Sequence, residues 1–517
     1  MSCLRGVRYR FLVPFLPPLI LYLGLSNVLP HSRQLPPASD QAALAGISRS
    51  LLRGEGFARP AVYPFYFAFP FCVDLLGNSI APLPDLERPP FYPVYLAFLF
   101  RLFGVGDRTF WWSGLPLFLL SLVLIRRLGD ASIGKGAGKW CLLLFGCNSV
   151  VIRVFTESRF EALPVLLVLG LSVILHQFEF RITGFRRGAI LGLVLGLLYL
   201  SYYPGIVLLI LALGFFSRSQ KRFQPAALWG ILAGFGALVL PWGIRNYGIT
   251  GNPFFSIQSH LEFLNDTPGW GDFSPYRASE RIGILSSMLN HPGWYVAKIL
   301  RNLGRSAWIL IRVLSPLGAV LLLSRLPDGK MRGEDTRWKY VVALVVVWIS
   351  FFAVASKIQP RYLIPALGPV FATVVAPGLR GGRFRYWALV ACYGLFVSES
   401  TIRGIGHFLS AETKDSMIGY GRVAEVTAAD DWIVSDDDTA TAWYADRKTC
   451  WLPGTEGNLR KVIQLLKPGA VYLKNGLDAP LVAETPLHQS GFDVLDLAYG
   501  KHEALLDGGI VWSDPKE

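Results

Sequence analysis

The sequence predicts an α-helical polytopic membrane protein of about 11 transmembrane helices, followed by a small soluble α/β domain. Of its 517 residues, 52% are hydrophobic and only 17% are charged. The mean hydropathy is +0.41, which lies on the membrane side of ordinary globular composition. Apolar segments recur through residues 1–404, whereas residues 405–517 are much less hydrophobic. We therefore predict a transmembrane domain over 1–404 and a separate soluble domain over 405–517.

A membrane-spanning helix needs roughly 20 consecutive, mostly apolar residues. Segments of this kind, some of them short, lie at 11–30, 109–125, 137–152, 160–177, 187–203, 204–217, 226–244, 299–324, 339–356, 361–379 and 386–404. The first segment is long and no small-residue cleavage site follows it, so we interpret it as a retained helix and not as a signal peptide.

Basic residues mark every second connection between these segments. They are Arg5, Arg8 and Arg10; Arg126, Arg127, Lys135 and Lys139; Arg181, Arg186 and Arg187; Arg218, Lys221 and Arg222; Arg325, Lys330, Arg332, Arg337 and Lys339; and Arg380, Arg383 and Arg385. The positive-inside rule then predicts a cytoplasmic N-terminus. An odd number of spans places the domain 405–517 on the extracytoplasmic side, together with the long loops 31–108 and 245–298.

The net charge of +14 could also indicate a nucleic-acid partner. No nucleic-acid-binding motif accompanies it, so we predict no nucleic-acid partner and assign the charge to membrane topology. The six cysteines form no CxxC pair, which supports neither a zinc site nor a disulfide framework.

The C-terminal domain shows strand-like stretches bounded by Gly, Pro and Asp. They are "DDWIVSDDD", "KTCWLPG", "GAVYLKN" and "GGIVWSD", and their content predicts a small α/β or α+β fold without a Gly-rich phosphate loop. The run Asp436–Asp438 precedes a predicted helix. It is more simply a cap and turn than a calcium loop, because the EF-hand spacing is absent.

The stretch "SDQAALAGISRSLL" directly follows the first apolar segment. Ser39 is a good N-cap, Asp40 lies where the helix dipole favours a negative charge, and apolar side chains recur at helical spacing at Leu44, Ile47 and Leu51. We expect an amphipathic helix in the membrane interface, with a polar face formed by Ser48, Arg49 and Arg53. Asp40 has two interpretations, as a residue that stabilises the helix start or as a functional carboxylate.

Aromatic residues are dense in the first outer loop, at Tyr63, Phe65, Tyr66, Phe67, Phe69 and Phe71. Such rings could stack on a sugar or line a groove for a lipid chain. Membrane-interface belts use the same residue types more often, so a belt is the favoured interpretation.

Several longer stretches resemble the membrane glycosyltransferases of the C-type (GT-C) fold. They are "ERPPFYPVYLAFLFRLFG" at 87–104, "RVFTESRFEALPVLLVLGLSVIL" at 153–175, "GLVLGLLYLSYYPGIVLL" at 192–209, "PWGIRNYGITGNPFFS" at 241–256 and "RYLIPALGPVFA" at 361–372. Their order and spacing carry the resemblance, which is nearest to bacterial lipid A aminoarabinose transferases and protein O-mannosyltransferases.

This resemblance implies an integral-membrane glycosyltransferase of the bacterial inner (cytoplasmic) membrane. It would transfer a hexosyl or pentosyl group from a polyprenyl-phosphate sugar donor to a lipid, glycan or protein acceptor outside the membrane. The acidic residue that the family carries in the active site of its first outer loop matches Asp40. A second acidic position matches Glu157, with Glu161 as the nearby alternative. The family often has Asp-Glu at the first position, whereas this chain has Asp40 and Gln41.

General chemistry agrees with these assignments. A carboxylate can remove the proton of an acceptor hydroxyl as the new bond forms, which is the role expected for Asp40. The departing polyprenyl phosphate gathers negative charge that cationic side chains stabilise. Candidates for this phosphate-binding role are Arg88 and Arg361, with Lys357 and Tyr362 as lesser ones.

Each arginine also has a structural interpretation. Arg88 could be a loop residue held by Glu87, and Arg361 could be an interface anchor whose charge reaches the lipid headgroups.

No metal site is predicted, because the histidines are dispersed. A divalent cation between Asp40 and Glu157 remains an alternative without support from spacing. A secondary transporter or flippase of envelope lipids is the alternative function, and a non-catalytic scaffold is a third. A transporter should show repeated halves and interrupted helices, and the sequence shows neither.

Overall fold

The structure is a computed structural model that divides into two compact units. It describes residues 13–32, 39–78, 83–179, 182–219, 225–264, 274–278, 283–325, 336–355, 358–372, 416–474, 495, 499–505 and 510–515. The first unit comprises Met1–Leu29, Trp111–Arg245 and Ala297–Ser410. The second unit comprises Pro30–Phe110, Asn246–Val296 and Ala411–Glu517.

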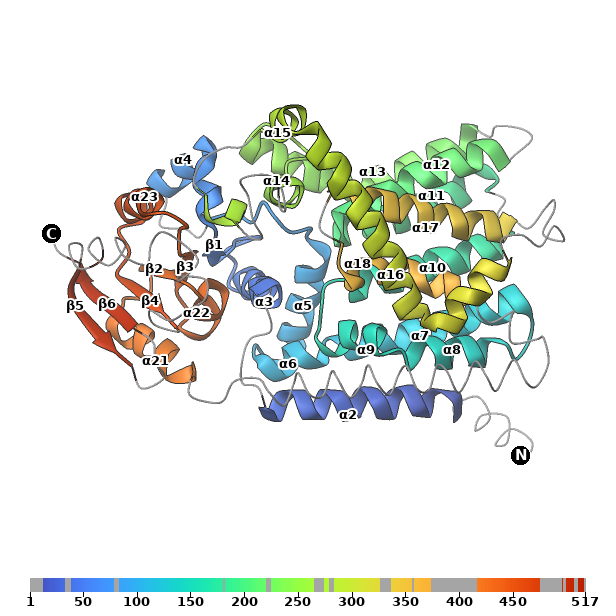
Figure 1. Ribbon diagram of the computed structural model, residues 1–517, viewed down its shortest axis with the longest axis horizontal. Helices are drawn as coiled ribbons and strands as arrows, with labels where there is room; N and C mark the ends of the chain where they lie inside the picture. The colour runs from blue at the N-terminus through green and yellow to red at the C-terminus, as the bar shows by residue number, and fades with distance from the viewer. Residues whose placement is uncertain are drawn as a thin grey trace. The chain divides into compact units, whose positions relative to one another are not determined.

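The described part of the first unit is helical (Figure 1). Its helices are α2 (Leu16–Ser32), α7 (Gly114–Ile133), α8 (Gly138–Gly146), α9 (Ser149–Thr156), α10 (Ala162–Gln177), α11 (Gly184–Ser201), α12 (Ile206–Ser219), α13 (Pro225–Thr250), α16 (Pro292–Arg325), α17 (Thr336–Ala355) and α18 (Pro360–Val370), with short 3₁₀ helices η1 (Val13–Phe15) and η3 (Tyr203–Gly205). Of these, α2, α13 and α16 continue past the boundary of the unit.

Three helical stretches in the described part are long and apolar enough to cross a membrane. They are Asp107–Ser132, Gly184–Ser201 and Pro225–Thr250, and α8 and α9 form a fourth candidate if the pair, bent by 67°, is one span. The chain is a multi-pass membrane protein. Each predicted span up to residue 379 contains a helix, and the last, 386–404, lies outside the described residues. The total of about 11 spans stays a prediction.

Glycines bring α11 and α13 into close contact. A Cβ added at Gly192 of α11 would lie 2.2 Å from the carbonyl oxygen of Ile231, and one added at Gly234 of α13 would lie 2.2 Å from that of Ala189. The same relation repeats one turn earlier on each helix, at Gly188 and Gly230. Small residues spaced by four let helix backbones approach closely in a membrane, where van der Waals packing replaces the hydrophobic effect.

The second unit contains both short helices and a sheet (Figure 1). Its helices are α3 (Ser39–Leu52), η2 (Pro64–Ala68), α4 (Pro70–Asn78), α5 (Phe91–Phe103), α6 (Asp107–Trp112), α14 (Ile257–Leu264), η4 (Ser274–Arg277), α15 (Ile284–Asn290), α21 (Ser416–Val426), α22 (Asp438–Tyr444) and α23 (Glu456–Leu466); its strands are β1 (Ala61–Val62), β2 (Trp432–Ser435), β3 (Lys448–Trp451), β4 (Ala470–Leu473), β5 (Tyr499–Ala504) and β6 (Ile510–Pro515).

The sheet has the strand order β1-β3-β2-β4-β6-β5. Strands β1, β3, β2 and β4 are parallel, while β6 pairs antiparallel with both β4 and β5. The four strand-like stretches predicted from the sequence are confirmed as β2, β3, β4 and β6, and the Asp436–Asp438 run does precede a helix, α22. Strands β5 and β1 were not predicted from the sequence. Strand β1 belongs to the first predicted outer loop, and Ala61 pairs with Thr449.

Alternating residues of the central strands pack on opposite faces of the sheet. Ile433 and Tyr472 pack in a cluster with α21 and α22, whereas Val434 and Val471 pack in a larger cluster with α23 and with residues 62–76 and 83–86 of the first loop. This is the period of two that a strand imposes on its side chains. The larger cluster makes the C-terminal sheet and the first loop parts of one hydrophobic core.

Two expectations for the first loop are wrong. Tyr63, Phe65, Tyr66, Phe67 and Phe69 are at most 3% exposed, so these rings belong to the core and do not form an interfacial belt. The expected polar face of α3 is also covered within the second unit at Ser48 and Arg49, whereas the side chain of Arg53 is 47% exposed. Ser48 donates to the carbonyl oxygens of Leu44 (2.7 Å) and Pro93 (3.0 Å), and Arg49 donates to the carbonyl oxygens of α22.

Candidate functional site

The second unit pairs two of the predicted site residues, Asp40 and Arg88. The helix start predicted at Ser39 is confirmed, and it holds Asp40 in the first turn of α3. The guanidinium of Arg88 forms an ion pair with Asp40 and a second one, at 2.7 Å, with Glu87. The Arg88 side chain is 4% exposed, whereas that of Asp40 is 23% exposed. The carboxylate of Asp40 is thus the solvent-accessible member of a pair whose cation is buried.

Behind this pair lies a second arginine that the sequence analysis did not select. Arg59 is 0% exposed, and its guanidinium pairs with Glu87 and, at 3.4 Å, with Asp85. It also donates to the hydroxyl of Tyr63 at 2.9 Å, and Asp85 accepts a hydrogen bond from the backbone N–H of Arg88 at 2.9 Å. Burial raises the pKa of Glu87, while Arg59 and Arg88 act in the opposite direction. The available sequence signal was the acidic run "DLER" at 85–88.

Asp438, the first residue of α22, faces the same region. It is 4% exposed, and burial raises the pKa of its carboxyl to about 7, against the opposing effect of Arg59. The negative charges of Asp437 and Glu87 raise that pKa further, whereas a backbone hydrogen bond at Thr439 lowers it. Its Oδ2 atom has no hydrogen-bond partner among the described residues.

In the first unit, the two candidate glutamates have different partners. Glu157, at the C-terminal end of α9, pairs with Arg153 at 2.9 Å and with Arg159 at 2.5 Å. Glu161, the alternative candidate, is 0% exposed and pairs with Arg361 at 3.1 Å. The structure therefore brings the predicted phosphate ligand Arg361 together with the alternative carboxylate.

Arg361 and Tyr362 begin α18. The Arg361 guanidinium lies 5.3 Å from the centre of the Tyr362 ring, and that ring stacks on Phe352 at 5.0 Å. The Tyr362 backbone carbonyl accepts a hydrogen bond from the indole of Trp348 at 2.6 Å. Lys357 lies outside the described residues. The start of α18 is thus held by aromatic packing, with one arginine only partly buried.

No set of three or more His, Cys, Asp or Glu side chains in the described part of the chain is arranged to hold a metal ion. The divalent cation considered between Asp40 and Glu157 stays an untested alternative.

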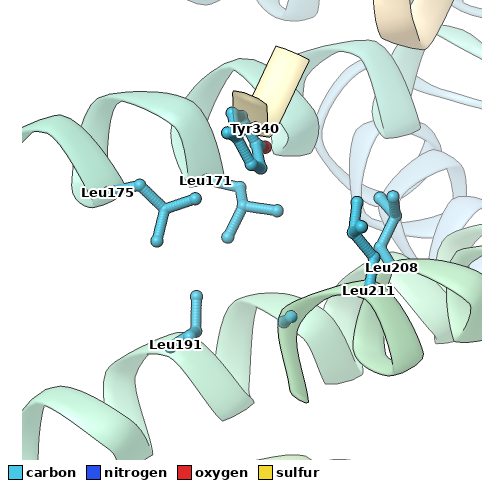
Figure 2. Close-up of a pocket in the computed structure, with 7 residues that line it drawn as sticks. Leu171, Leu175, Leu191, Leu208, Leu211 and Tyr340 are labelled. Atoms are coloured by element: carbon cyan, nitrogen blue, oxygen red, sulfur yellow. The ribbon is translucent and has the colours of Figure 1, made fainter. Parts of the chain in front are cut away.

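A pocket in the first unit is lined by apolar side chains and one tyrosine (Figure 2). Leu171 and Leu175 of α10, Leu191 of α11 and Tyr340 of α17 face it, together with Leu208, Leu211 and Ala212 of α12. It contains no cation that could bind a phosphate. We interpret it as a gap in helix packing and not as a substrate site.

The fold was compared with solved structures. ArnT, the lipid A aminoarabinose transferase, from Cupriavidus metallidurans bound to undecaprenyl phosphate has a TM-score of 0.60 at 12% identity, over 96% of this chain and 97% of that chain. The archaeal oligosaccharyltransferase AglB from Archaeoglobus fulgidus, in complex with an inhibitory peptide and a dolichol-phosphate, has a TM-score of 0.52 at 12% identity, over 97% of this chain and 74% of that chain.

This chain has the GT-C fold. No protein-family model matches the sequence, and no curated protein matches it. The likeness thus lies in the three-dimensional arrangement of the chain, and the resemblance predicted from the motifs is confirmed at the level of the fold. Almost the whole chain aligns with ArnT, so the structural similarity includes the C-terminal residues.

Proposed function

We propose that this GT-C chain is an integral-membrane glycosyltransferase that uses a polyprenyl-phosphate sugar as its donor and a hydroxyl of an extracytoplasmic lipid, glycan or protein as its acceptor. The observation that carries this proposal is the pairing of Asp40 with Arg88, which sets an accessible carboxylate beside a buried guanidinium. The GT-C fold shared with ArnT and AglB, which bind polyprenyl phosphates in their solved structures, supports the donor class.

Asp40 acts as the general base. It takes the proton of the acceptor hydroxyl while the acceptor oxygen forms its bond to the anomeric carbon of the sugar. The bond between that carbon and the phosphate oxygen breaks, and the polyprenyl phosphate leaves with the electron pair. A carboxylate paired with a guanidinium takes up a proton less readily than an unpaired one. Arg88 therefore keeps Asp40 a weak base until another anion competes for the guanidinium.

The donor phosphate is that competing anion. Arg88 is a strong ligand for it, since a guanidinium forms two parallel hydrogen bonds with a phosphate. When Arg88 turns toward the phosphate, Asp40 loses its cation and becomes a stronger base at the moment when the donor is in place. Binding of the donor and activation of the base are then one event, which limits proton transfer in the absence of the donor.

From the sequence resemblance we also assign a donor-phosphate role to Arg361, with Tyr362 and Lys357 as further candidates. The ion pair with Glu161 already orients the Arg361 guanidinium before the donor binds. Glu157, fixed by Arg153 and Arg159, orients the acceptor. The chain works in the inner membrane with its second unit on the extracytoplasmic side.

The test is transfer of radiolabelled sugar from a purified polyprenyl-phosphate donor by the full-length protein in detergent. Asp40→Asn should reduce transfer by about 10²–10⁴-fold, since the amide keeps the size of the side chain but cannot accept the proton. Arg88→Gln should raise the KM for the donor more than that for the acceptor, and Arg88→Lys should recover part of the loss. Transfer by Asp40→Asn at more than about a tenth of the wild-type rate would remove Asp40 from the base role. Wild-type protein that moves labelled lipid or solute across vesicles without transferring the sugar would favour a flippase or transporter.

A further inference from the structure

Arg59 is a fully buried guanidinium in the second unit, outside the pair to which the chemistry is assigned. Burying a charged side chain costs several kcal/mol unless partners replace the water it loses. Arg59 has such partners on every side: the Ala61 carbonyl oxygen, the Tyr63 hydroxyl, and the carboxylates of Asp85 and Glu87. Its guanidinium also lies 4.7 Å from the centre of the Tyr63 ring.

The partners of Arg59 lead directly to Asp40. One oxygen of Glu87 pairs with Arg59, and the other lies 2.7 Å from Arg88, whose guanidinium pairs with Asp40. Charges of opposite sign thus alternate along Arg59, Glu87, Arg88 and Asp40, a set we call the charge relay chain. Glu87 cannot move without changing the direction from which Arg88 approaches Asp40.

The other end of the charge relay chain is fixed to the C-terminal sheet. Arg59 directly precedes Pro60 and β1, and the Pro60 carbonyl oxygen accepts a hydrogen bond from the backbone N–H of Thr449 at 2.7 Å. Ala61, to whose carbonyl oxygen Arg59 donates, is paired in register with Thr449 of β3. A displacement of β3 would therefore move Arg59.

The helix that carries Asp40 is fixed to the same C-terminal segment by a separate route. Arg49 of α3 donates to the carbonyl oxygens of Trp443 (2.9 Å) and Ala442 (2.8 Å) in α22. Arg53 makes a two-point contact with the carboxylate of Asp446, at 2.9 and 2.7 Å. Both members of the Asp40 and Arg88 pair are thus tied to residues 442–450.

We propose that Arg59 and Glu87 are positioning residues through which the C-terminal sheet holds Arg88 beside Asp40, in the position from which Arg88 turns to the donor phosphate. This inference rests on the proposed function and extends it, since it makes the C-terminal segment a part of the transfer machinery. Neither residue touches the reacting atoms. Their effect on the reaction passes through the placement of Arg88.

The experiment compares Arg59→Gln, Glu87→Gln and the double variant in the full-length protein. Arg59→Gln leaves a buried carboxylate with one cation fewer, which lowers thermal stability. The double variant removes both charges and should recover stability. It should not recover turnover, because Arg88 has then lost its anchor. We expect kcat to fall by about 10²-fold, which is the scale for a displacement of 1 Å, with the acceptor KM nearly unchanged.

Two further variants complete the design. Arg59→Lys keeps a cation for Glu87 and should recover part of the turnover. Arg422→Gln is the matched control: Arg422 of α21 lies outside residues 442–450 and pairs with Glu425 at 3.0 Å and with Glu503 at 2.9 Å. It should lower stability slightly and leave kcat unchanged. A double variant with wild-type stability and wild-type kcat would overturn the proposal.

Hydrogen exchange gives a readout that does not depend on transfer. In the double variant, peptides covering 39–52 and 83–93 should exchange faster than in wild-type protein, while the Arg422→Gln variant should alter neither. If wild-type protein fails to transfer sugar but these peptides respond, the proposed function fails and the coupling stands. Unchanged exchange in the 39–52 peptide of the double variant would overturn the coupling whatever the activity.

Discussion

At the scale of single residues, substitutions of Arg361 and Glu161 can distinguish the loss of a cation from the loss of an ion pair. Arg361 is 18% exposed at its side chain, whereas Glu161 is 0% exposed. A partly exposed guanidinium with a buried counter-charge can contact a ligand without losing the partner that holds it. A change at either residue breaks the same ion pair, but only one of them removes the cation.

We therefore expect Arg361→Gln to raise the donor KM by about tenfold or more, which corresponds to a lost hydrogen bond between charged groups. Glu161→Gln should lower thermal stability without raising the donor KM, because the guanidinium remains. Steady-state transfer at varied donor concentration, with thermal unfolding on the same samples, measures both. Equal rises of the donor KM in the two variants would assign the pair a purely structural role.

Asp438 makes a prediction about pH. Its pKa of about 7 in the folded protein exceeds the ordinary value of 3.8, so the folded state binds more protons than the unfolded state between these values. Stability from this group therefore falls as the pH rises from about 4 to about 7, and the whole loss is present above pH 7.

The Asp438→Asn variant has no ionisable group at this position, so it does not lose stability in this way as the pH rises. At pH 8 the variant should have a higher free energy of unfolding than wild-type protein, by at most about 4 kcal/mol, and the difference should shrink toward pH 4. Thermal unfolding in detergent at several pH values measures it. A difference that is constant with pH would show that Asp438 is charged or neutral to the same extent in both states.

At the scale of elements, the close contact of α11 and α13 depends on glycines. Gly192→Leu places a side chain where a Cβ already meets a carbonyl oxygen at 2.2 Å, so the helices must separate. We expect a loss of about 1–3 kcal/mol, the usual cost of overpacking. The matched control is Gly236→Leu in α13, where the nearest atom lies 3.6 Å away on a side chain of the same helix. Thermal unfolding of both variants tests this, and equal destabilisation would contradict the packing argument.

The elements also show what the sequence could predict. Helix α3 and Asp40 in its first turn followed from a cap and a helical spacing within 14 residues, since such signals are local. Strand β1 has only two residues, which are too few to show an alternating pattern. It forms because it pairs with β3. Arg59 was missed for the same reason. It precedes a proline in a loop, and the neighbouring sequence does not indicate that its side chain is buried against two carboxylates. The buried aromatic residues of the first loop were assigned to an interface belt because composition alone does not distinguish a belt from a core.

At the scale of the whole molecule, the alternation of basic loops predicts on which side of the membrane each segment lies. In a background without the six native cysteines, Glu425→Cys should react with an impermeant thiol reagent in cells whose outer barrier is removed. Lys135→Cys should react only after the membrane is opened. Glu425 has a side chain that is 67% exposed, and Lys135 is exposed as well, so both thiols are accessible to the reagent. The reverse pattern of labelling would invert the predicted topology.

The pairing of β1 with β3 has a consequence for the time course of synthesis. Ala61 leaves the ribosome about 390 residues before Thr449, its partner, and at 5–20 residues per second this interval lasts about 20–80 s. Throughout it, the apolar side chains at 62–69 have no strand or helix of the C-terminal segment to cover them. A nascent chain in this state is open to proteases and to association with its neighbours. Chains that end before residue 449 should therefore be degraded even when every helix of the first unit has already entered the membrane.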